Sequence, residues 1–320
     1  MQQTARISVV IPCYRVRSSV LGVIASIPAI VEKIYVVDDA CPEHTGDYVR
    51  SQCADPRVTV LVNPDNLGVG GAVMRGYWQA LQDKYDIVIK IDGDGQMDGS
   101  LVPVFVEPIL SGEADYTKGN RFYHPDSLNH MPTIRLLANA LLSFITKLSS
   151  GYWHIFDPTN GYTAISANAL KRLPLDKISQ RYFFESDMMF RLNTIRAVIF
   201  DVPMDAVYAG ERSNLKLSAN ILPFIKGHCC NMFKRIIYNY YLRNFSLASL
   251  QLLIGLPLML FGIIYGTHHW ILSAETRVPA TAGTVMVASL PIIVGLQLLL
   301  SFLNYDINSV PRHPISRSLR

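Results

Sequence analysis

Residues 85–100, YDIVIKIDGDGQMDGS, join a short apolar run to three aspartates that stand within seven positions. The run YDIVI is rich in β-branched residues and predicts a buried strand. Carboxylates packed this closely repel one another, so Asp92, Asp94 and Asp98 need positive charge at the strand end. A hard divalent cation, which takes oxygen ligands and commonly also holds substrate phosphates, is the expected partner.

The spacing of these acids excludes an EF-hand. Such a loop needs glycine at its sixth position and glutamate at its twelfth, where this chain has Met97 and Pro103. A Mg²⁺ or Mn²⁺ ion held between one or two carboxylates and a diphosphate fits better. Asp94 is the best ligand candidate, with Asp92 and Gln96 in support. The alternative is a loop whose aspartates only cap the next helix, a role expected in any case for Asp98.

Short apolar runs and helical patterns alternate on either side of this motif. The runs ISVVIP (7–12), KIYVVDD (33–39) and RVTVLVN (57–63) predict strands, and SSVLGVIASIPAIV (18–31), GDYVRSQC (46–53) and AVMRGYWQALQD (72–83) predict helices. This alternation predicts an α/β fold with a mostly parallel, Rossmann-like sheet covered on both faces. Ligands bind such sheets at the carboxyl ends of the strands. Asp38 and Asp39 should therefore face the same crevice as Asp92 and Asp94.

The glycine-rich segment NLGVGGAVMRG (66–76) is weak evidence for a nucleotide-binding fingerprint. A GxGxxG motif read from Gly68 requires a glycine at position 73, which is Val73, and no P-loop GK[ST] follows. The segment is better interpreted as a tight turn into a helix.

The last third of the chain carries most of the apolar excess. Half of all residues are hydrophobic and 17% are charged, and the mean hydropathy is +0.22. Residues 244–267 and 278–305 are free of charge, and each exceeds the ~20 residues that a helix needs to cross a bilayer. Membrane helices tolerate Pro257 and Pro291. A pair of buried core helices is the alternative.

The link between these stretches, HHWILSAETR (268–277), is short and predicts a hairpin with both ends on one side. Arg277 is the only lysine or arginine in the link. Seven such residues flank the outer ends of the two stretches: Lys226, Lys234, Arg235, Arg243, Arg312, Arg317 and Arg320. The positive-inside rule places these ends in the cytoplasm. We expect an integral membrane protein with two transmembrane helices, in a bacterial inner membrane.

Charge and cysteine content agree with that location. The five cysteines show no CxxC or zinc spacing, as in a reducing compartment. A net charge of +4, much of it beside the apolar stretches, favours an anionic lipid surface over nucleic acid. Residues 219–244 mix aromatic and basic side chains, which is typical of a helix in the headgroup plane. A solvated linker is the alternative for this segment.

The ordered set SVVIPCY, VVDDA, NLGVGGAVMRG and DGDGQMD resembles the family-2 glycosyltransferases of GT-A fold. The later KGNRF, DPTNGY and YFFESDMMFRL, followed by a two-helix hairpin, are similar to the polyprenyl-phosphate sugar transferases within that family. The resemblance covers nearly the whole chain. It implies a GT-A catalytic domain over residues 1–218, juxtamembrane helices over 219–244, a transmembrane hairpin over 245–306 and a basic tail over 307–320.

The resemblance also implies roles for individual residues. Pro12, Tyr14, Asp38 and Asp39 would line the pocket for the nucleobase and ribose, and Asp92, Asp94 and Gln96 would hold the metal and the donor diphosphate. Arg121, Arg135, Arg212 and the weaker candidate Lys216 would bind the acceptor phosphate. Glu185 and Asp187 would form the acidic pair that orients sugar or acceptor. The implied partners are a nucleotide sugar linked to UDP or GDP, a polyprenyl phosphate and the bilayer, with homo-oligomers such as tetramers expected.

The chain departs from the family pattern at two places. Arg15 and Val16 stand where relatives carry Asn and Glu, and RSNLKLSAN after Arg212 lacks the usual glycine and Ser-Lys spacing. Two other functions compete. One is a membrane-bound transferase that extends a lipid-linked saccharide at a hydroxyl, for which Asp187 would be an essential base. The other is a non-catalytic membrane scaffold with a degenerate sugar-nucleotide fold.

Overall fold

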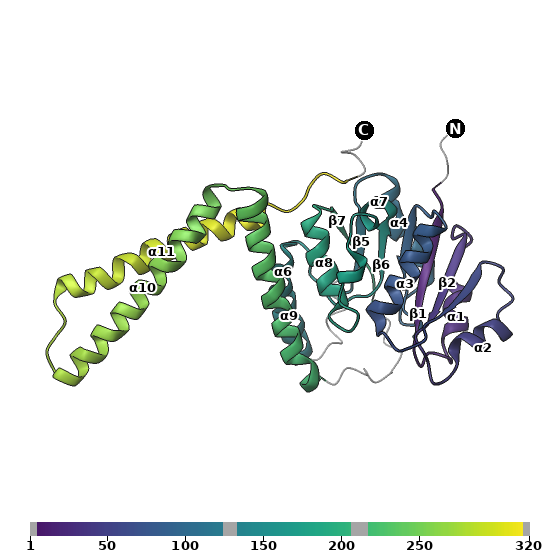
Figure 1. The fold of residues 1–320 in the computed structure, drawn as a ribbon, viewed down its shortest axis with the longest axis horizontal. Helices are drawn as coiled ribbons and strands as arrows, with labels where there is room; N and C mark the ends of the chain where they lie inside the picture. The colour runs from purple at the N-terminus through teal and green to yellow at the C-terminus, as the bar shows by residue number, and fades with distance from the viewer. Residues whose placement is uncertain (1–4, 124–132, 206–216, 316–320) are drawn as a thin grey trace. The chain divides into compact units, whose positions relative to one another are not determined.

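The computed structural model describes residues 5–123, 133–205 and 217–315. Within them the chain forms two compact units, one of residues 1–232 with 311–320, and one of residues 233–310. The first unit is built around a seven-stranded sheet with helices on both faces (Figure 1). The mostly parallel α/β architecture predicted from the sequence is confirmed.

The sheet has the strand order β3-β2-β1-β4-β6-β5-β7. Its strands are β1 (Ile7–Cys13), β2 (Lys33–Asp38), β3 (Val58–Val62), β4 (Ile87–Lys90), β5 (Tyr116–Asn120), β6 (Thr163–Ser166) and β7 (Ile199–Pro203). All neighbouring pairs are parallel except those of β6, which runs antiparallel to both β4 and β5. The carboxyl ends of β4 and β5 therefore meet the start of β6 at one edge of the sheet.

Helices of the first unit alternate with the strands. They are α1 (Val20–Ser26), α2 (Thr45–Gln52), α3 (Val69–Gln82), α4 (Val102–Leu110), α6 (Thr133–Ser150), α7 (Ala167–Leu170) and α8 (Phe184–Thr194), with 3₁₀ turns at Gly99–Leu101 and Leu175–Lys177. The helix predicted over residues 18–31 is shorter than expected and ends at Ser26. Pro28 accounts for this, because the residue before a proline avoids the helical region and Ile27 is extended.

Alternating residues of the central strands separate the two faces of the sheet. Ile7, Val9 and Ile11 of β1 pack into one apolar core with buried residues of α1, α2 and α4. Val10 points to the other face, where it abuts Gly76 of α3. Side chains project alternately along a strand, so Lys90 of β4 lies on the α3 side, opposite Ile89 in the apolar core.

Most of α9 (Leu217–Ile237) belongs to the first unit, and its last residues begin the second. The second unit continues with a π-helix (Tyr238–Arg243), α10 (Leu247–Thr276) and α11 (Ala282–Asn308). The link predicted over residues 268–277 is wrong, because α10 continues to Thr276 and the connection is residues 277–281. α10 and α11 are long and apolar enough to cross a membrane. In the most apolar 18-residue stretch of each helix, 22% of α10 and 11% of α11 is buried. At Gly255, Gly262 and Gly295 an added Cβ would lie within 2.8 Å of the other helix, so these glycines let the two helices approach closely.

A buried ion pair joins three parts of the second unit. Arg235 of α9 donates two hydrogen bonds to the Asp306 carboxylate of α11, at 2.6 and 3.0 Å. The Tyr240 hydroxyl, in the π-helix, donates to the same carboxylate at 2.5 Å. All three side chains are buried, which makes the cluster a fixed connection at the base of the helix pair.

Candidate active site

The acidic strand end contains a lysine that pairs with two of its carboxylates. Lys90 is 1% exposed, and its Nζ lies 2.8 Å from Asp92 Oδ1 and 3.6 Å from Glu185 Oε1. Burial lowers the pKa of Lys90, but the Asp92 and Glu185 charges together raise it above its ordinary value. The lysine is therefore a permanent positive charge between the end of β4 and the start of α8.

Asp94 and Gln96 lie in the tight turn beyond β4. Both are half-buried, and Asp94 Oδ1 accepts a hydrogen bond from the Gln96 backbone N–H at 3.0 Å. Gly95 between them has φ +83°, the left-handed conformation that such a turn requires. Asp98 caps the following 3₁₀ turn by accepting from the Ser100 N–H at 2.9 Å, so the capping role predicted for it is confirmed.

The donor set at this turn suits a cation that is shared with a ligand. Within the described part of the chain, no three His, Cys, Asp or Glu side chains form a metal-binding group. A Mg²⁺ or Mn²⁺ ion held by one or two carboxylates, with the rest of its shell from phosphate and water, needs no such group. Asp94, with Asp92 and Gln96 beside it, fits that kind of site.

Asp38 and Asp39, at the end of β2, are buried and accept hydrogen bonds from the protein itself. The Asp38 oxygens accept from the N–H groups of Cys41 at 2.7 Å and Gly46 at 2.6 Å. The Asp39 oxygens accept from Asn63 Nδ2 at 2.7 Å, Leu67 N at 2.9 Å and Gly68 N at 2.7 Å. The two carboxylates thus fix the loops after β2 and β3, and their contact with a nucleotide stays a prediction.

Pro12 and Tyr14 differ in exposure. Pro12 is buried within β1, whereas Tyr14 is 44% exposed just beyond it. Arg15, one of the departures from the family pattern, has φ +58° and its guanidinium carbon lies 5.5 Å from the Tyr14 ring centroid. The Tyr14 ring and the Arg15 side chain are therefore the accessible part of this segment.

The glycines at the start of α3 accommodate another loop. A Cβ on Gly70 would lie 2.4 Å from the Ser179 carbonyl oxygen, and one on Gly68 would lie 2.7 Å from the Gln180 carbonyl oxygen. The Gly71 N–H also donates to the Gln180 carbonyl at 3.0 Å. Gly68 has φ +86° at the helix cap, so the predicted tight turn is confirmed. The glycines let the chain before α8 lie against α3, which fixes the start of α8.

The acidic pair of α8 is split between two environments. Glu185 is 16% exposed and faces Lys90. The Asp187 side chain is 6% exposed and accepts from the Ser179 N–H at 2.9 Å, Arg191 Nε at 3.1 Å and Asn231 Nδ2 at 3.0 Å. Asp187 therefore connects α8 to α9, and Glu185 is the acid beside the β4 end.

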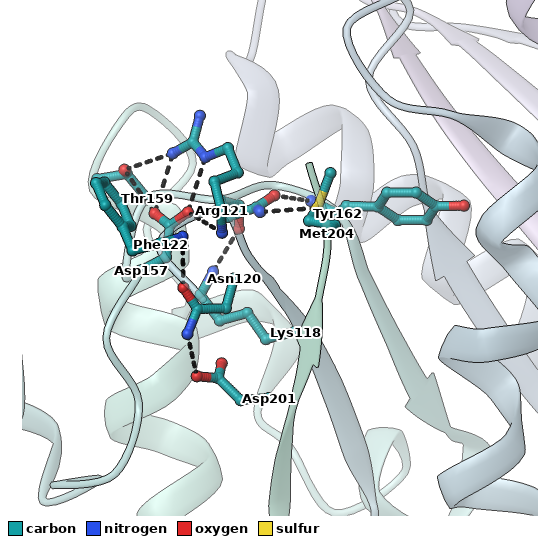
Figure 2. Close-up of polar contacts among 10 residues, drawn as sticks. Lys118, Asn120, Arg121, Phe122, Asp157, Thr159, Tyr162, Asp201 and Met204 are labelled. Atoms are coloured by element: carbon teal, nitrogen blue, oxygen red, sulfur yellow. Dashed lines mark hydrogen bonds and ion pairs between the residues drawn. The ribbon is translucent and has the colours of Figure 1, made fainter. Parts of the chain in front are cut away.

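Arg121 follows β5 and pairs with Asp157 through two parallel contacts (Figure 2). Its Nε lies 2.7 Å from Asp157 Oδ2 and one terminal nitrogen lies 3.0 Å from Oδ1, with Thr159 Oγ1 at 3.4 Å. Asp157 is 1% exposed and Arg121 is 28% exposed. A buried carboxylate thus holds a partly exposed guanidinium in one orientation at the sheet edge.

A row of polar side chains crosses the sheet beneath this loop. In the sheet register, Lys90 of β4 and Lys118 of β5 both lie opposite Thr163 of β6, and Lys118 also lies beside Asp201 of β7. Burial lowers the pKa of Lys118 to about 8, against the opposing charges of Asp157 and Glu185. Burial raises the pKa of Asp201 to about 6. The Lys118 ammonium also donates to the Asn160 carbonyl, and so supports the loop from below.

Several of these residues were absent from the sequence predictions. Lys90 ends the otherwise apolar strand IVIK, and that contrast was the available signal. Lys118 stands in the mixed strand YTKGN, which gives no such contrast. Asp157 belongs to the DPTNGY motif but no role was predicted for it. Arg212 and Lys216, expected to bind the acceptor phosphate, lie outside the described residues, as does the side chain of Arg135 in α6.

Comparisons with known proteins identify the family. The model of glycosyl transferase family 2 matches residues 8–173, more than half of the chain. The undecaprenyl-phosphate mannosyltransferase of Micrococcus luteus is 32% identical over 191 residues, 59% of this chain and 77% of that protein. The UDP-N-acetylglucosamine–dolichyl-phosphate N-acetylglucosaminyltransferase of Methanococcus voltae is 26% identical over 216 residues, 63% and 86% of the two chains.

Solved structures share the fold. Glucosyl-3-phosphoglycerate synthase from Mycobacterium tuberculosis in complex with UDP has a TM-score of 0.54 at 21% identity, covering 72% of this chain and 80% of that one. The same protein with Mn²⁺, UDP-glucose and phosphoglyceric acid has a TM-score of 0.51 at 20% identity, with 72% and 79% coverage. At this identity the likeness concerns the fold alone.

Proposed function

This chain belongs to glycosyl transferase family 2, and from that premise we propose its reaction. It transfers one monosaccharide from a nucleotide sugar to a polyprenyl phosphate in the presence of Mg²⁺ or Mn²⁺. Transfer is a single displacement that inverts the anomeric carbon. The product is a polyprenyl-phosphate sugar, as the names of the M. luteus and M. voltae relatives suggest.

One observation carries this proposal. The loop from Asp157 to Gly161 contacts both Arg121 and the acidic strand end. Asp157 holds Arg121, and Gly161 lies against Lys90 and Asp92, where a Cβ would be 2.2 Å from Nζ and 2.6 Å from Oδ2. Four residue steps span at most about 14 Å. A fixed arginine is therefore close to the acidic strand end that would receive a metal-bound diphosphate.

The acceptor chemistry suits this arrangement. A phosphate monoester has its second pKa near about 6 and is mostly dianionic at neutral pH. Such a nucleophile carries no proton that must be removed, so a general base is not required. The task of the protein is to hold two anions together. A guanidinium held by Asp157 contributes through fork-shaped contacts to phosphate oxygens.

On the donor side, Asp94 with Asp92 and Gln96 is the proposed holder of the cation and diphosphate. A bound divalent ion supplies Lewis-acid neutralisation of the charge that develops on the leaving diphosphate. The fold neighbours crystallised with Mn²⁺ or Mg²⁺ and UDP support a divalent ion as the cofactor. Glu185, on the first turn of α8, is proposed to orient the donor sugar or the acceptor.

The helix pair α10–α11 supports a bilayer location for the acceptor. Both helices are mostly exposed and apolar, as expected for segments that lipid surrounds. We propose that they cross the membrane as a hairpin with the sheet domain in the cytoplasm, where nucleotide sugars are available. Basic residues at the outer ends of the hairpin support this orientation.

The alternative of transfer to a saccharide hydroxyl depends on Asp187 as a base. Its three donors, Ser179, Arg191 and Asn231, engage the carboxylate in contacts within the protein. A base must reach the proton that it removes, and Asp187 is buried between α8 and α9. The alternative of a non-catalytic scaffold predicts no turnover.

The test is product formation by the full chain purified in detergent. Undecaprenyl or dolichyl phosphate is incubated with a panel of UDP- and GDP-sugars and Mn²⁺ or Mg²⁺, and the lipid product is identified by mass spectrometry. We expect a mass increase of one hexose or N-acetylhexosamine with one donor, and no product with Asp94→Asn. Elongation of a lipid-linked saccharide but not of the bare lipid phosphate would favour the alternative transferase. No product from any donor would overturn the proposal.

A further inference from the structure

Lys90 occupies the position where a cation would neutralise the acidic strand end. It is 1% exposed, and its Nζ is within 4 Å of carboxylate oxygens from two elements, Asp92 beyond β4 and Glu185 on α8. The strand register places Lys90 beside Thr163 of β6, and its Nζ reaches Glu185 on α8. The repulsion among the acids that follow β4 is therefore relieved in part by the protein itself.

The geometry also restricts Asp92. Its Oδ1 is 2.8 Å from the Lys90 ammonium, and its Oδ2 lies where a Cβ on Gly161 would come within 2.6 Å. The two carboxylate oxygens of Asp92 therefore face a buried lysine and the backbone of the 157–161 loop, and the side chain as a whole is 29% exposed. Asp94 Oδ1 accepts a hydrogen bond from the Gln96 N–H within its own turn.

We propose that Lys90 is a positioning residue, an internal counter-cation that holds Asp92 and Glu185 in place. This inference rests on the proposed function. It narrows the role of Asp92 from a supporting metal ligand to the ordering of the crevice, and it links α8 to the strand end through one ammonium group.

A physical consequence separates this role from simple packing. Removing one partner of a buried ion pair leaves an uncompensated charge and is strongly destabilising, whereas removing both can be nearly neutral. Lys90→Met should therefore lower the unfolding midpoint by about 10 °C. Adding Asp92→Asn to that variant should recover at least about half of the loss. If Lys90 only filled space, adding Asp92→Asn would not raise the unfolding midpoint of Lys90→Met.

The experiment uses the full chain in detergent and two readouts. The first is the thermal unfolding midpoint of wild type, Lys90→Met, Asp92→Asn and the double variant. The second is Mn²⁺ binding followed by electron paramagnetic resonance, with UDP or GDP as the probe nucleotide. We expect Asp94→Asn to weaken Mn²⁺ binding at least about tenfold, a difference of about 1.4 kcal/mol. We expect Asp92→Asn to change it less than about threefold.

The outcomes distinguish this inference from the proposed function. If Asp92→Asn weakens Mn²⁺ binding as strongly as Asp94→Asn, or if the double variant is no more stable than Lys90→Met, the role of Lys90 is overturned while the reaction stands. If the wild-type chain binds no Mn²⁺ with either nucleotide, the metal-dependent function fails, and the inference fails with it. Should Lys90→Met not fold alone, the double variant and the two aspartate variants still decide.

Discussion

Glu185 and Asp187 lie two residues apart on α8, yet their partners give them different tasks. Glu185 faces Lys90 at the acidic strand end. Asp187 is held by one backbone N–H and by two side chains that reach it from α8 and α9. We therefore expect substitution of Glu185 to affect transfer and substitution of Asp187 to affect stability.

The first prediction compares Glu185→Gln with Asp187→Asn. Glu185→Gln removes a charge at the crevice and should lower kcat about 10²-fold, with the unfolding midpoint nearly unchanged. Asp187→Asn replaces an acceptor oxygen with an amide among three donors and should cost about 2 kcal/mol of stability. Transfer rates and thermal unfolding of the two purified variants measure this. An Asp187→Asn protein of normal stability but without transfer would favour Asp187 as the base.

The second prediction concerns Arg121, whose guanidinium pairs in parallel with Asp157. Arg121→Lys keeps the charge but cannot make the fork-shaped contact. We expect the KM for polyprenyl phosphate to rise about tenfold, as for the loss of one hydrogen bond to a charged group, with the donor KM little changed. Arg172→Lys, at an exposed position in the same unit, is the matched control. Equal increases in both KM values would contradict an acceptor role.

At the scale of elements, the sequence was most informative where local pattern determines structure. The β-branched runs of β1 and β2 and the glycine-capped α3 form close to where they were expected. β6 is only four residues long, TAIS, and its antiparallel direction depends on pairing with β4 and β5 rather than on its own pattern. The π-helix after α9 likewise has no periodic signal.

In the candidate site, too, some features follow from local sequence and others depend on strand pairing. The acids at the strand end could be predicted because they are close in sequence. The contact of Lys90 with Gly161 and that of Asp157 with Arg121 could not, because they depend on how β4, β5 and β6 are aligned in the sheet. Sequence spacing indicates which residues share a strand, but only the sheet register indicates which side chains meet across it.

The third prediction concerns the contact between α6 and α9. His228 of α9 is 3% exposed, its ring Nδ1 lies 2.8 Å from Ser149 Oγ, and Phe183 and Phe224 pack around it. Burial lowers the pKa of His228 to about 4, because an apolar setting disfavours the charged ring. The neutral ring therefore contributes stability that is complete above the unfolded pKa near about 6.5.

That stability should be lost as the pH falls from about 6.5 toward 4, by up to about 3 kcal/mol at the lower limit. His228→Phe removes the titrating group and should flatten the pH dependence of unfolding over this window. His313→Phe, at an exposed position, is the control and should leave the dependence as it is. Denaturant unfolding at several pH values measures both. An equally steep dependence in His228→Phe would assign the effect to other groups.

At the scale of the molecule, the end of the chain returns to the unit in which it began. The Ile315 N–H donates to both oxygens of Asp115, at 2.9 and 3.0 Å, and Asp115 also accepts from the Val198 N–H at 2.9 Å. Pro311, Pro314 and Ile315 are buried. Both ends of the segment 233–310 are thus joined to the sheet domain, so any membrane crossing by that segment must be made an even number of times.

The fourth prediction tests this connection by cysteine labelling in intact cells and inverted vesicles. In a background without the exposed Cys229 and Cys230, single cysteines are placed at the exposed positions Ala280, Arg312 and Arg172. Arg312→Cys and Arg172→Cys should label together from the cytoplasmic side, since Ile315 anchors the tail to the domain that carries Arg172. Ala280→Cys, in the connection between the end of α10 at Thr276 and the start of α11 at Ala282, should label only from the opposite side. Labelling of all three from one side would mean that α10 and α11 lie on the membrane or pack elsewhere, because two crossings must put the link and the tail on different faces of the bilayer.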